Sequence, residues 1–245
     1  PKLNFFRKIL WKLAAKKLHC ITCPTKKTLE IMQSHKIIDN DKLKLLYDPV
    51  IGDFNFSKVK SLEIDEIQNE KFYFAAGRLT KQKNFLFLCR CFKNILEKFP
   101  NEKLLIAGDG EERKRIEKFI KNNNLEKNIY LLGHIDDIFP FFKNCKGFIL
   151  SSLWEDPGFV LIESAIMRSF IFSSNCLSGP NEIIKDNFNG IIFNNNDEKS
   201  FINKFNIFHN LDKKRDKKIL LNNLKLARKF SLFNHYKNLD KILNL

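Results

Sequence analysis

The chain has 245 residues, of which 44% are hydrophobic and 13% aromatic, and this apolar content excludes a disordered chain. Its net charge of +15 fits either an anionic partner or the codon bias of an A+T-rich genome, and the even spread of the lysines favours the codon bias. The sequence has no nucleic-acid recognition motif, which argues against a nucleic-acid partner. No run reaches the roughly 18 apolar residues of a transmembrane helix and no signal peptide opens the chain, so we expect a cytoplasmic protein.

The first predicted element is a basic amphipathic helix over residues 3–18. Apolar residues recur along one stripe of this helix, lysines along another, and no acidic residue precedes Glu30. A helix of this kind either lies on an anionic membrane surface or packs on a partner domain. The short apolar stripe favours packing on a partner, and contact with a membrane stays an alternative.

From about residue 72, short apolar runs alternate with helical patterns. The predicted strands cover residues 72–76, 103–107, 128–132, 147–150, 170–173 and 191–193. The predicted helices cover residues 85–99, which Asn84 caps, a stretch beginning at 111, and residues 159–167 and 181–185, with a helical tail from about 197. Apolar runs between helices are typical of strands covered on both faces, so the predicted fold class is α/β, with a doubly wound, Rossmann-like parallel sheet.

Ligands bind beyond the carboxyl ends of the strands in such sheets, so the residues that follow each strand are the candidates for function. After the first strand come Gly77 and Arg78, and then Lys83 just before a helix. The glycine permits a sharp turn, while the guanidinium fork and the ammonium group could hold a diphosphate without a metal. Basic residues near a helix start are common, so this pattern needs support from elsewhere in the chain.

Two further strand ends carry polar residues. Gly108-Asp109-Gly110 is interpreted as a tight turn rather than a metal motif, and no Asp-x-Asp motif stands at a suitable strand end, so no metal site is predicted. After the third strand, the backbone around Ile135 could meet a nucleobase. Asp136 or Asp137 could equally cap the short helix that follows.

The most specific pattern runs from Ser151 to Glu163 (SSLWEDPGFVLIE). A strand ends in this segment, an acidic loop containing Glu155 follows, and a helix starts at a Pro-Gly pair. The first amides of that helix, at Gly158, Phe159 and Val160, can face an anion or a sugar hydroxyl. Two separated carboxylates can each accept hydrogen bonds from vicinal hydroxyls, and Glu163 among apolar neighbours needs partners of this kind.

The spacing E-x7-E from Glu155 to Glu163, with Gly-Arg-Leu at 77–79 and Lys83 upstream, resembles the retaining glycosyltransferases of family 4. These enzymes have the GT-B fold, in which two Rossmann-like domains face each other across a cleft. Residues 176–184, residues 189–192 and a closing helix at 230–243 extend the resemblance over most of the chain.

The resemblance implies a role for each candidate residue. Arg78 and Lys83, after the Gly77 turn, would hold the donor diphosphate and stabilise the leaving group. The backbone of Ile135 would meet the base, Glu163 would bind the ribose, and Glu155 would bind the transferred sugar. The backbone amides of Gly158, Phe159 and Val160 would bind the sugar or the distal phosphate.

The implied activity is that of a retaining hexosyltransferase in surface polysaccharide or glycan biosynthesis. Its donor would be a UDP-sugar or GDP-sugar with no further cofactor, and its acceptor a glycan or a lipid-linked sugar. The protein would then be cytoplasmic and peripheral at the inner face of an anionic membrane.

The resemblance also implies a division of the chain. Residues 1–55 correspond to the end of an N-terminal acceptor domain, with a helix, a strand at 19–23, a helix at 25–35 and a final strand into 48–50. Residues 56–230 correspond to the nucleotide-sugar-binding domain and 231–245 to a return helix. Because the chain starts at Pro1 and holds little of the acceptor domain, we expect a fragment whose missing domain another chain supplies. The alternative is a nucleotide-sugar-binding module or an inactive truncated remnant.

Overall fold

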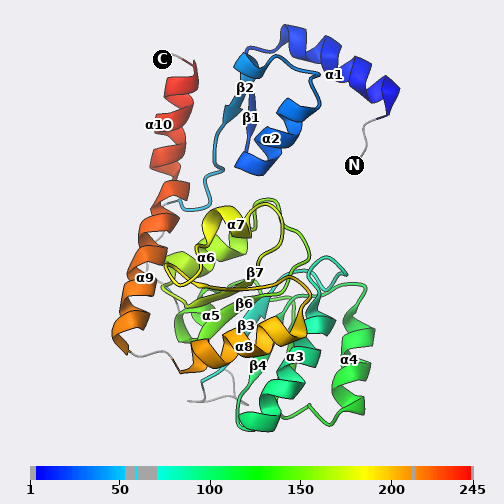
Figure 1. Ribbon diagram of the computed structural model, residues 1–245, viewed down its shortest axis with the longest axis vertical. Helices are drawn as coiled ribbons and strands as arrows, with labels where there is room; N and C mark the ends of the chain where they lie inside the picture. The colour runs from blue at the N-terminus through cyan, green and yellow to red at the C-terminus, as the bar shows by residue number, and fades with distance from the viewer. Residues whose placement is uncertain (1–3, 53–58, 60–70, 211–212, 244–245) are drawn as a thin grey trace.

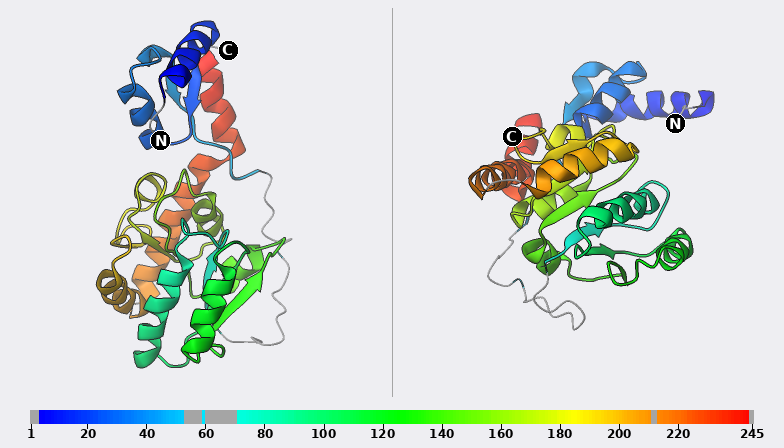
Figure 2. Two further views of the ribbon diagram at one scale, coloured as in Figure 1. Left: turned by 90° about the vertical axis from the view of Figure 1, so that its right-hand side faces the viewer. Right: turned by 60° about the horizontal axis from the view of Figure 1, so that its bottom comes forward.

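The computed structural model describes residues 4–52, 59, 71–210 and 213–243. These residues form two lobes, each built on its own parallel sheet (Figure 1). We call residues 4–52 the small lobe and residues 71–230 the large lobe. The last helix, α10 (Leu232–Leu243), leaves the large lobe and runs beside the small lobe (Figures 1 and 2).

The small lobe contains a two-stranded sheet and two main helices. Its elements in chain order are α1 (Phe5–Lys17), β1 (Ile21–Cys23), α2 (Lys26–Ser34), the 3-10 helix η1 (Asn40–Lys42) and β2 (Leu43–Leu45). The helix predicted at 3–18 is confirmed over 5–17, and its first residue follows Asn4, whose side chain accepts from the Arg7 amide. Residue 3 lies outside the described residues.

The predicted final strand leading into residues 48–50 is present, but it ends before these residues. The strand paired with β1 is β2, which ends at Leu45. Pro49 cannot donate to a strand ladder. The amides of Val50 and Ile51 instead donate to the carbonyl of Phe230, at 3.0 and 3.1 Å. This stretch is therefore the passage between the lobes and not part of the small sheet.

The large lobe is built on six parallel strands in the order β5-β4-β3-β6-β7-β8. Their bounds are β3 (Tyr73–Ala76), β4 (Leu104–Ala107), β5 (Ile129–Gly133), β6 (Gly147–Leu150), β7 (Ile171–Ser174) and β8 (Ile191–Phe193). This order confirms the predicted doubly wound, Rossmann-like sheet. The direction of winding reverses between β3 and β6, and ligands bind at such a reversal point.

Helices cover both faces of the large sheet (Figures 1 and 2). One hydrophobic cluster joins the sheet to α3 (Phe85–Lys98), α4 (Arg113–Asn122) and α8 (Glu198–His209). A second cluster joins the other face to α5 (Phe139–Asn144), α6 (Phe159–Ile166), α7 (Pro180–Ile183), α9 (Lys213–Ala227) and η4 (Arg228–Phe230). The strands are thus buried on both faces, which accounts for their continuous apolar runs.

The predicted cap of α3 needs a correction. Asn84 occupies the cap position, but its backbone is left-handed, with φ 55°, and its side chain makes no capping hydrogen bond. Nδ2 of the Asn84 side chain donates instead to Oδ1 of Asn196 at 3.1 Å. Asparagine tolerates this backbone conformation better than most residues, so Asn84 stabilises the turn before α3 rather than capping the helix with its side chain.

Candidate functional site

A cavity of about 350 Å³ opens at the carboxyl ends of β3 and β6, where the sheet changes direction. The predicted site residues that line it are Gly77, Lys83, Glu155, Gly158, Phe159, Val160 and Glu163. Ala76, Ile138, Asp156 and Pro157 complete its wall. The fold therefore brings residues from two distant segments of the chain to one place.

An ion pair lies in the wall of this cavity. Nζ of Lys83 is 2.6 Å from Oε1 of Glu155, and the two side chains are only 17% and 6% exposed. The hydroxyl of Ser152 donates to the same oxygen at 2.5 Å. A Cβ at Gly77 would lie 3.2 Å from Cε of Lys83, so the glycine leaves room for the lysine side chain. Sequence reasoning listed Lys83 and Glu155 but did not predict that they pair.

The loop that carries Glu155 is fixed by neighbouring segments. The Leu153 amide donates to the Gln82 carbonyl and the Gln82 side chain donates to the Trp154 carbonyl, both at 2.8 Å. The side chain of Asn195 donates to the Leu153 carbonyl at 2.8 Å. These bonds tie the loop after β6 to the loop after β3 and hold Glu155 in the cavity wall.

Helix α6 supplies the other side of the cavity. Its N-cap, Gly158, has a left-handed backbone with φ 86°, a conformation that favours glycine. The first amides of a helix have no acceptor within the helix, and the residues that carry them here line the cavity. The helix dipole adds positive potential at the same place, so this side of the cavity suits an anion or a hydroxyl oxygen.

Glu163 lies in the second turn of α6, half-buried in the cavity wall. Burial raises the pKa of its carboxyl above the ordinary value. Among the described residues, no donor forms a hydrogen bond or ion pair with this carboxylate. A half-buried acid in a cavity without a protein partner is a candidate for ligand binding, because a ligand can supply the missing donors.

Arg78 and Ile135 follow strand ends on the same edge of the sheet but do not line this cavity. The Arg78 side chain is exposed and pairs with no described residue. Ile135 is half-buried against the core beside α5. The Asp137 side chain accepts from the amide of Phe139, the first residue of α5, at 3.1 Å. The N-cap residue of α5 is Ile138, so the prediction of Asp136 or Asp137 at that position is wrong by one residue, although Asp137 does bond the first amide of the helix.

The loop between β7 and α7 also supports the site. The hydroxyl of Ser178 donates to the carbonyl of Glu155. Gly179 has a φ of 53°, and a Cβ there would lie 2.0 Å from the Pro157 carbonyl oxygen. The sequence places this segment within the family resemblance but indicates no role for Ser178 or Gly179, because both act through contact with a loop some twenty residues away.

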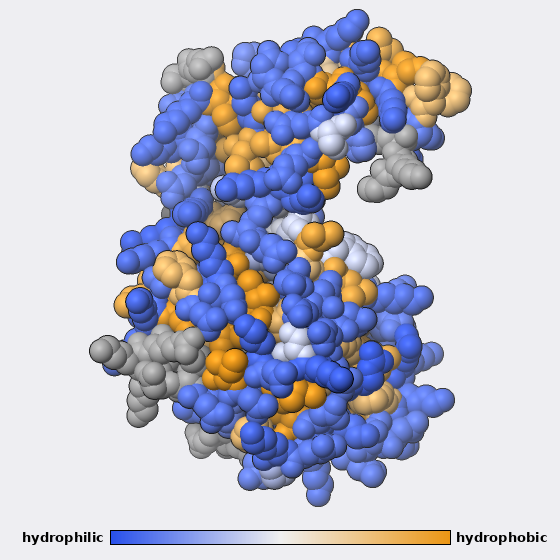
Figure 3. All heavy atoms as spheres, viewed as in Figure 1, coloured by the Kyte–Doolittle hydropathy of each residue, from blue (hydrophilic) through white to orange (hydrophobic). Residues whose placement is uncertain are grey.

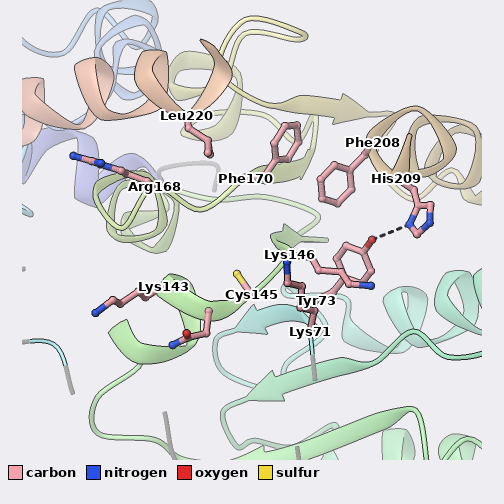
Figure 4. A pocket seen from close by; sticks show the side chains of 11 residues that line it. Lys71, Tyr73, Lys143, Cys145, Lys146, Arg168, Phe170, Phe208, His209 and Leu220 are labelled. Atoms are coloured by element: carbon pink, nitrogen blue, oxygen red, sulfur yellow. Dashed lines mark hydrogen bonds between the residues drawn. The ribbon is translucent and has the colours of Figure 1, made fainter. Parts of the chain in front are cut away.

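A larger cavity of about 620 Å³ lies at the opposite ends of the strands (Figure 4). Its lining residues Lys71, Lys146 and Phe170 each precede a strand. Within it, the Tyr73 hydroxyl and Nδ1 of His209 are 3.3 Å apart, as the dashed line shows. This cavity contains none of the predicted site residues and is distinct from the candidate site.

Comparison with known proteins identifies relatives of the chain. The family model for glycosyl transferases group 1 matches residues 58–219. An uncharacterized glycosyltransferase of Methanocaldococcus jannaschii is 33% identical over 194 residues, which are 75% of this chain and 47% of that protein. The UDP-Gal:alpha-D-GlcNAc-diphosphoundecaprenol alpha-1,3-galactosyltransferase of Escherichia coli is 32% identical over 183 residues, 73% of this chain and 46% of that enzyme.

The fold is shared with solved structures. The crystal structure of Anabaena HepE in complex with UDP and glucose superposes with a TM-score of 0.80 at 16% identity, covering 99% of this chain and 68% of that one. The chain spans about half the length of the curated relatives it matches. No helix in the described part of the chain is both long and apolar enough to cross a membrane. The family match covers most of the chain and includes the loops that build the cavity, and the chain therefore belongs to the group 1 glycosyl transferases.

Proposed function

We propose that the chain binds a nucleotide-sugar donor, a UDP-sugar or a GDP-sugar, and forms the donor half of a retaining hexosyltransferase. The observation that carries this proposal is the placement of Glu163. This half-buried carboxylate without a described partner lies in the same cavity as the Lys83–Glu155 pair and the first amides of α6. A nucleotide sugar offers hydroxyls for the acids and a diphosphate for the cation and the amides.

Each group then has a distinct task. Glu163 accepts hydrogen bonds from the two ribose hydroxyls, which supply the donors its position lacks. Glu155 accepts from a hydroxyl of the transferred sugar. The amides of Gly158 to Val160 contact the sugar or the distal phosphate, and the backbone of Ile135 contacts the base.

The chemical step is the departure of the nucleoside diphosphate. Negative charge develops on the leaving phosphate, and Lys83, Arg78 and the amino end of α6 stabilise it. The acceptor attacks from the face that the diphosphate leaves, which gives retention without a protein nucleophile. No metal or further cofactor takes part in this proposal.

The acceptor is proposed to be a glycan or a lipid-linked sugar at the inner, cytoplasmic face of the membrane. The Escherichia coli relative acts on a diphosphoundecaprenol-linked sugar, as its name states. Helix α1 adds support, because Phe5, Phe6 and Leu10 are 72%, 75% and 65% exposed beside basic residues. Figure 3 shows hydrophobic atoms at the surface at this end of the molecule. A helix with exposed aromatic and basic residues suits an anionic bilayer surface.

Liposome co-sedimentation tests the membrane contact. The chain should sediment with vesicles of anionic phospholipid and much less with neutral vesicles, and the double variant F6S/L10S should lose this binding. The matched control is I207S, which alters an exposed apolar residue on α8 at 46% exposure. Equal sedimentation of F6S/L10S and the parent chain would contradict the proposal.

Calorimetry with UDP and GDP tests donor binding. One of the two nucleotides should bind at millimolar concentration or below, and Glu163→Ala should weaken that binding. A chain that binds neither nucleotide at millimolar concentration would refute the proposal.

A second candidate function is a nucleotide-sugar-binding module without transferase activity, with the acceptor domain supplied by another chain or absent. The chain spans about half the length of the curated relatives it matches, so sugar transfer is tested separately from donor binding. Transfer of radiolabelled sugar to a lipid-linked acceptor, with and without a separately produced Rossmann half, distinguishes the two functions.

A further inference from the structure

The acidic residue next to Glu155 contacts the other lobe. Oδ2 of Asp156 accepts from the hydroxyl of Thr28 at 3.0 Å, and Oδ1 accepts from the same hydroxyl at 3.1 Å and from Thr25 at 3.2 Å. Thr25 is the N-cap of α2 and is 2% exposed. A side chain of the large-lobe loop is thus bound at the start of a small-lobe helix.

A second large-lobe carboxylate binds the same helix end. The two oxygens of Glu182 on α7 accept from the amides of Lys26 and Lys27, both at 2.8 Å. These amides open α2 and have no acceptor within it, and the positive end of the helix dipole favours the negative charge. Figure 1 shows α2 directly above α7. We call the bonds of Asp156 and Glu182 to residues 25–28 the interlobe contact.

Both carboxylates sit on the segments that hold Glu155. Asp156 is its neighbour in the chain. Glu182 is on the helix that follows Ser178 and Gly179, which touch the carbonyl of Glu155 and that of Pro157. The start of helix α2 therefore binds both the loop that carries Glu155, through Asp156, and the segment that supports this loop, through Glu182.

We propose that Asp156 is a positioning residue that acts through Glu155, and that the interlobe contact makes donor affinity depend on the docking of the small lobe. This inference rests on the proposed donor function. When α2 is docked, Glu155 is restrained toward Lys83 and the cavity. When it is not, the loop keeps only its bonds within the large lobe, and donor binding must supply the missing restraint. The coupling is reciprocal, so a bound donor strengthens the contact between the lobes.

The first test is a double-mutant cycle on the affinity for a UDP-sugar or GDP-sugar, measured by calorimetry on the chain, because Glu155 is proposed to contact the sugar. Thr28→Val and Asp156→Ala should each weaken binding, by about fivefold, and the double variant should be no weaker than the more affected single one. Asp156→Asn, which keeps an acceptor for Thr28, should restore most of the affinity. Thr22→Val is the matched control, because Thr22 is an exposed small-lobe threonine whose hydroxyl bonds no described residue.

Thr28 decides between positioning and a purely local role. It belongs to the other lobe and does not line the cavity. If Thr28→Val binds the nucleotide sugar as tightly as the parent chain while Asp156→Ala does not, Asp156 acts only within its own loop and the proposal is overturned.

The second test does not depend on nucleotide binding. Hydrogen exchange at the Lys26 and Lys27 amides should be faster in Glu182→Gln and Asp156→Ala than in the parent chain, and added nucleotide should slow it in the parent. If the parent chain binds no nucleotide, the proposed function fails, but hydrogen exchange still tests the interlobe contact. Faster exchange in both variants supports the contact, and unchanged exchange overturns it.

Discussion

Lys83 and Glu155 form an ion pair of 2.6 Å across two loops that are seventy-two residues apart in the chain. Both side chains are mostly buried, so each charge depends on the other for compensation. The pair fixes the relative position of the loops after β3 and β6. A ligand that carries negative charge would compete with Glu155 for the lysine.

Breaking this pair should cost stability. Lys83→Ala leaves the Glu155 carboxylate buried with only the Ser152 hydroxyl, so we expect a loss of about 3 kcal/mol in the free energy of unfolding. The double variant K83M/E155Q removes both charges and should lose less than Lys83→Ala alone. Urea unfolding followed by circular dichroism measures both. A double variant that is less stable than the single one would contradict this account.

Glu163→Gln should stabilise the chain at neutral pH. Burial raises the pKa of Glu163 in the folded state, so ionising this group opposes folding. The penalty is absent below the unfolded pKa of about 4.3 and grows as the pH rises through the raised folded pKa. The gain in melting temperature should therefore be larger at pH 7 than at pH 4. An equal gain at both pH values would show that the carboxylate is not penalised in the fold.

The two acids should differ in their effect on nucleoside diphosphate binding. In the proposed complex only Glu163 contacts the ribose, whereas Glu155 contacts the transferred sugar. Glu163→Ala should weaken UDP or GDP by about tenfold and Glu155→Ala by less than about threefold. Calorimetry on folded variants provides the comparison. Equal losses would contradict the assignment of the ribose to Glu163.

Gly179→Ala should loosen the support of the Glu155 loop. A Cβ there would lie 2.0 Å from the Pro157 carbonyl oxygen, and the backbone has a positive φ of 53°, which residues with a side chain rarely adopt. We expect a loss of about 2 kcal/mol or more in the free energy of unfolding, with weaker nucleotide binding. Gly52→Ala is the control, because nothing lies within 4 Å of its Cβ position. It should change stability by less than about 0.5 kcal/mol.

The large-lobe strands were predictable because each is a short apolar run bounded by turn residues. Their observed ends differ from prediction by one residue or so, as with Tyr73 for the first strand. The end of the small-lobe strand at 43–45 was predicted too late in the chain, because its three residues carry little pattern and the apolar and proline residues near 48–50 belong to the passage between the lobes.

The site could be predicted in composition but not in pairing. Spacing and residue type select Glu155, Glu163 and Lys83, since ligand-binding residues follow strand ends in such sheets. No local pattern shows that Lys83 and Glu155 meet, or that Asp156 contacts Thr28. Those contacts arise from the strand order and from the docking of the lobes. The local pattern of apolar and polar residues predicts neither of them.

The backbone enters and leaves the large lobe at one point. Val50 and Ile51 donate to the Phe230 carbonyl, and the Leu232 amide donates to the Ile51 carbonyl at 2.8 Å. In topological terms the large lobe is an insertion with adjoining ends. A lobe of this kind can be removed, or exchanged for one with a different donor preference, by cutting and joining the chain at Ile51 and Phe230. These two residues are already hydrogen-bonded to each other, so the rest of the chain need not move to close the gap.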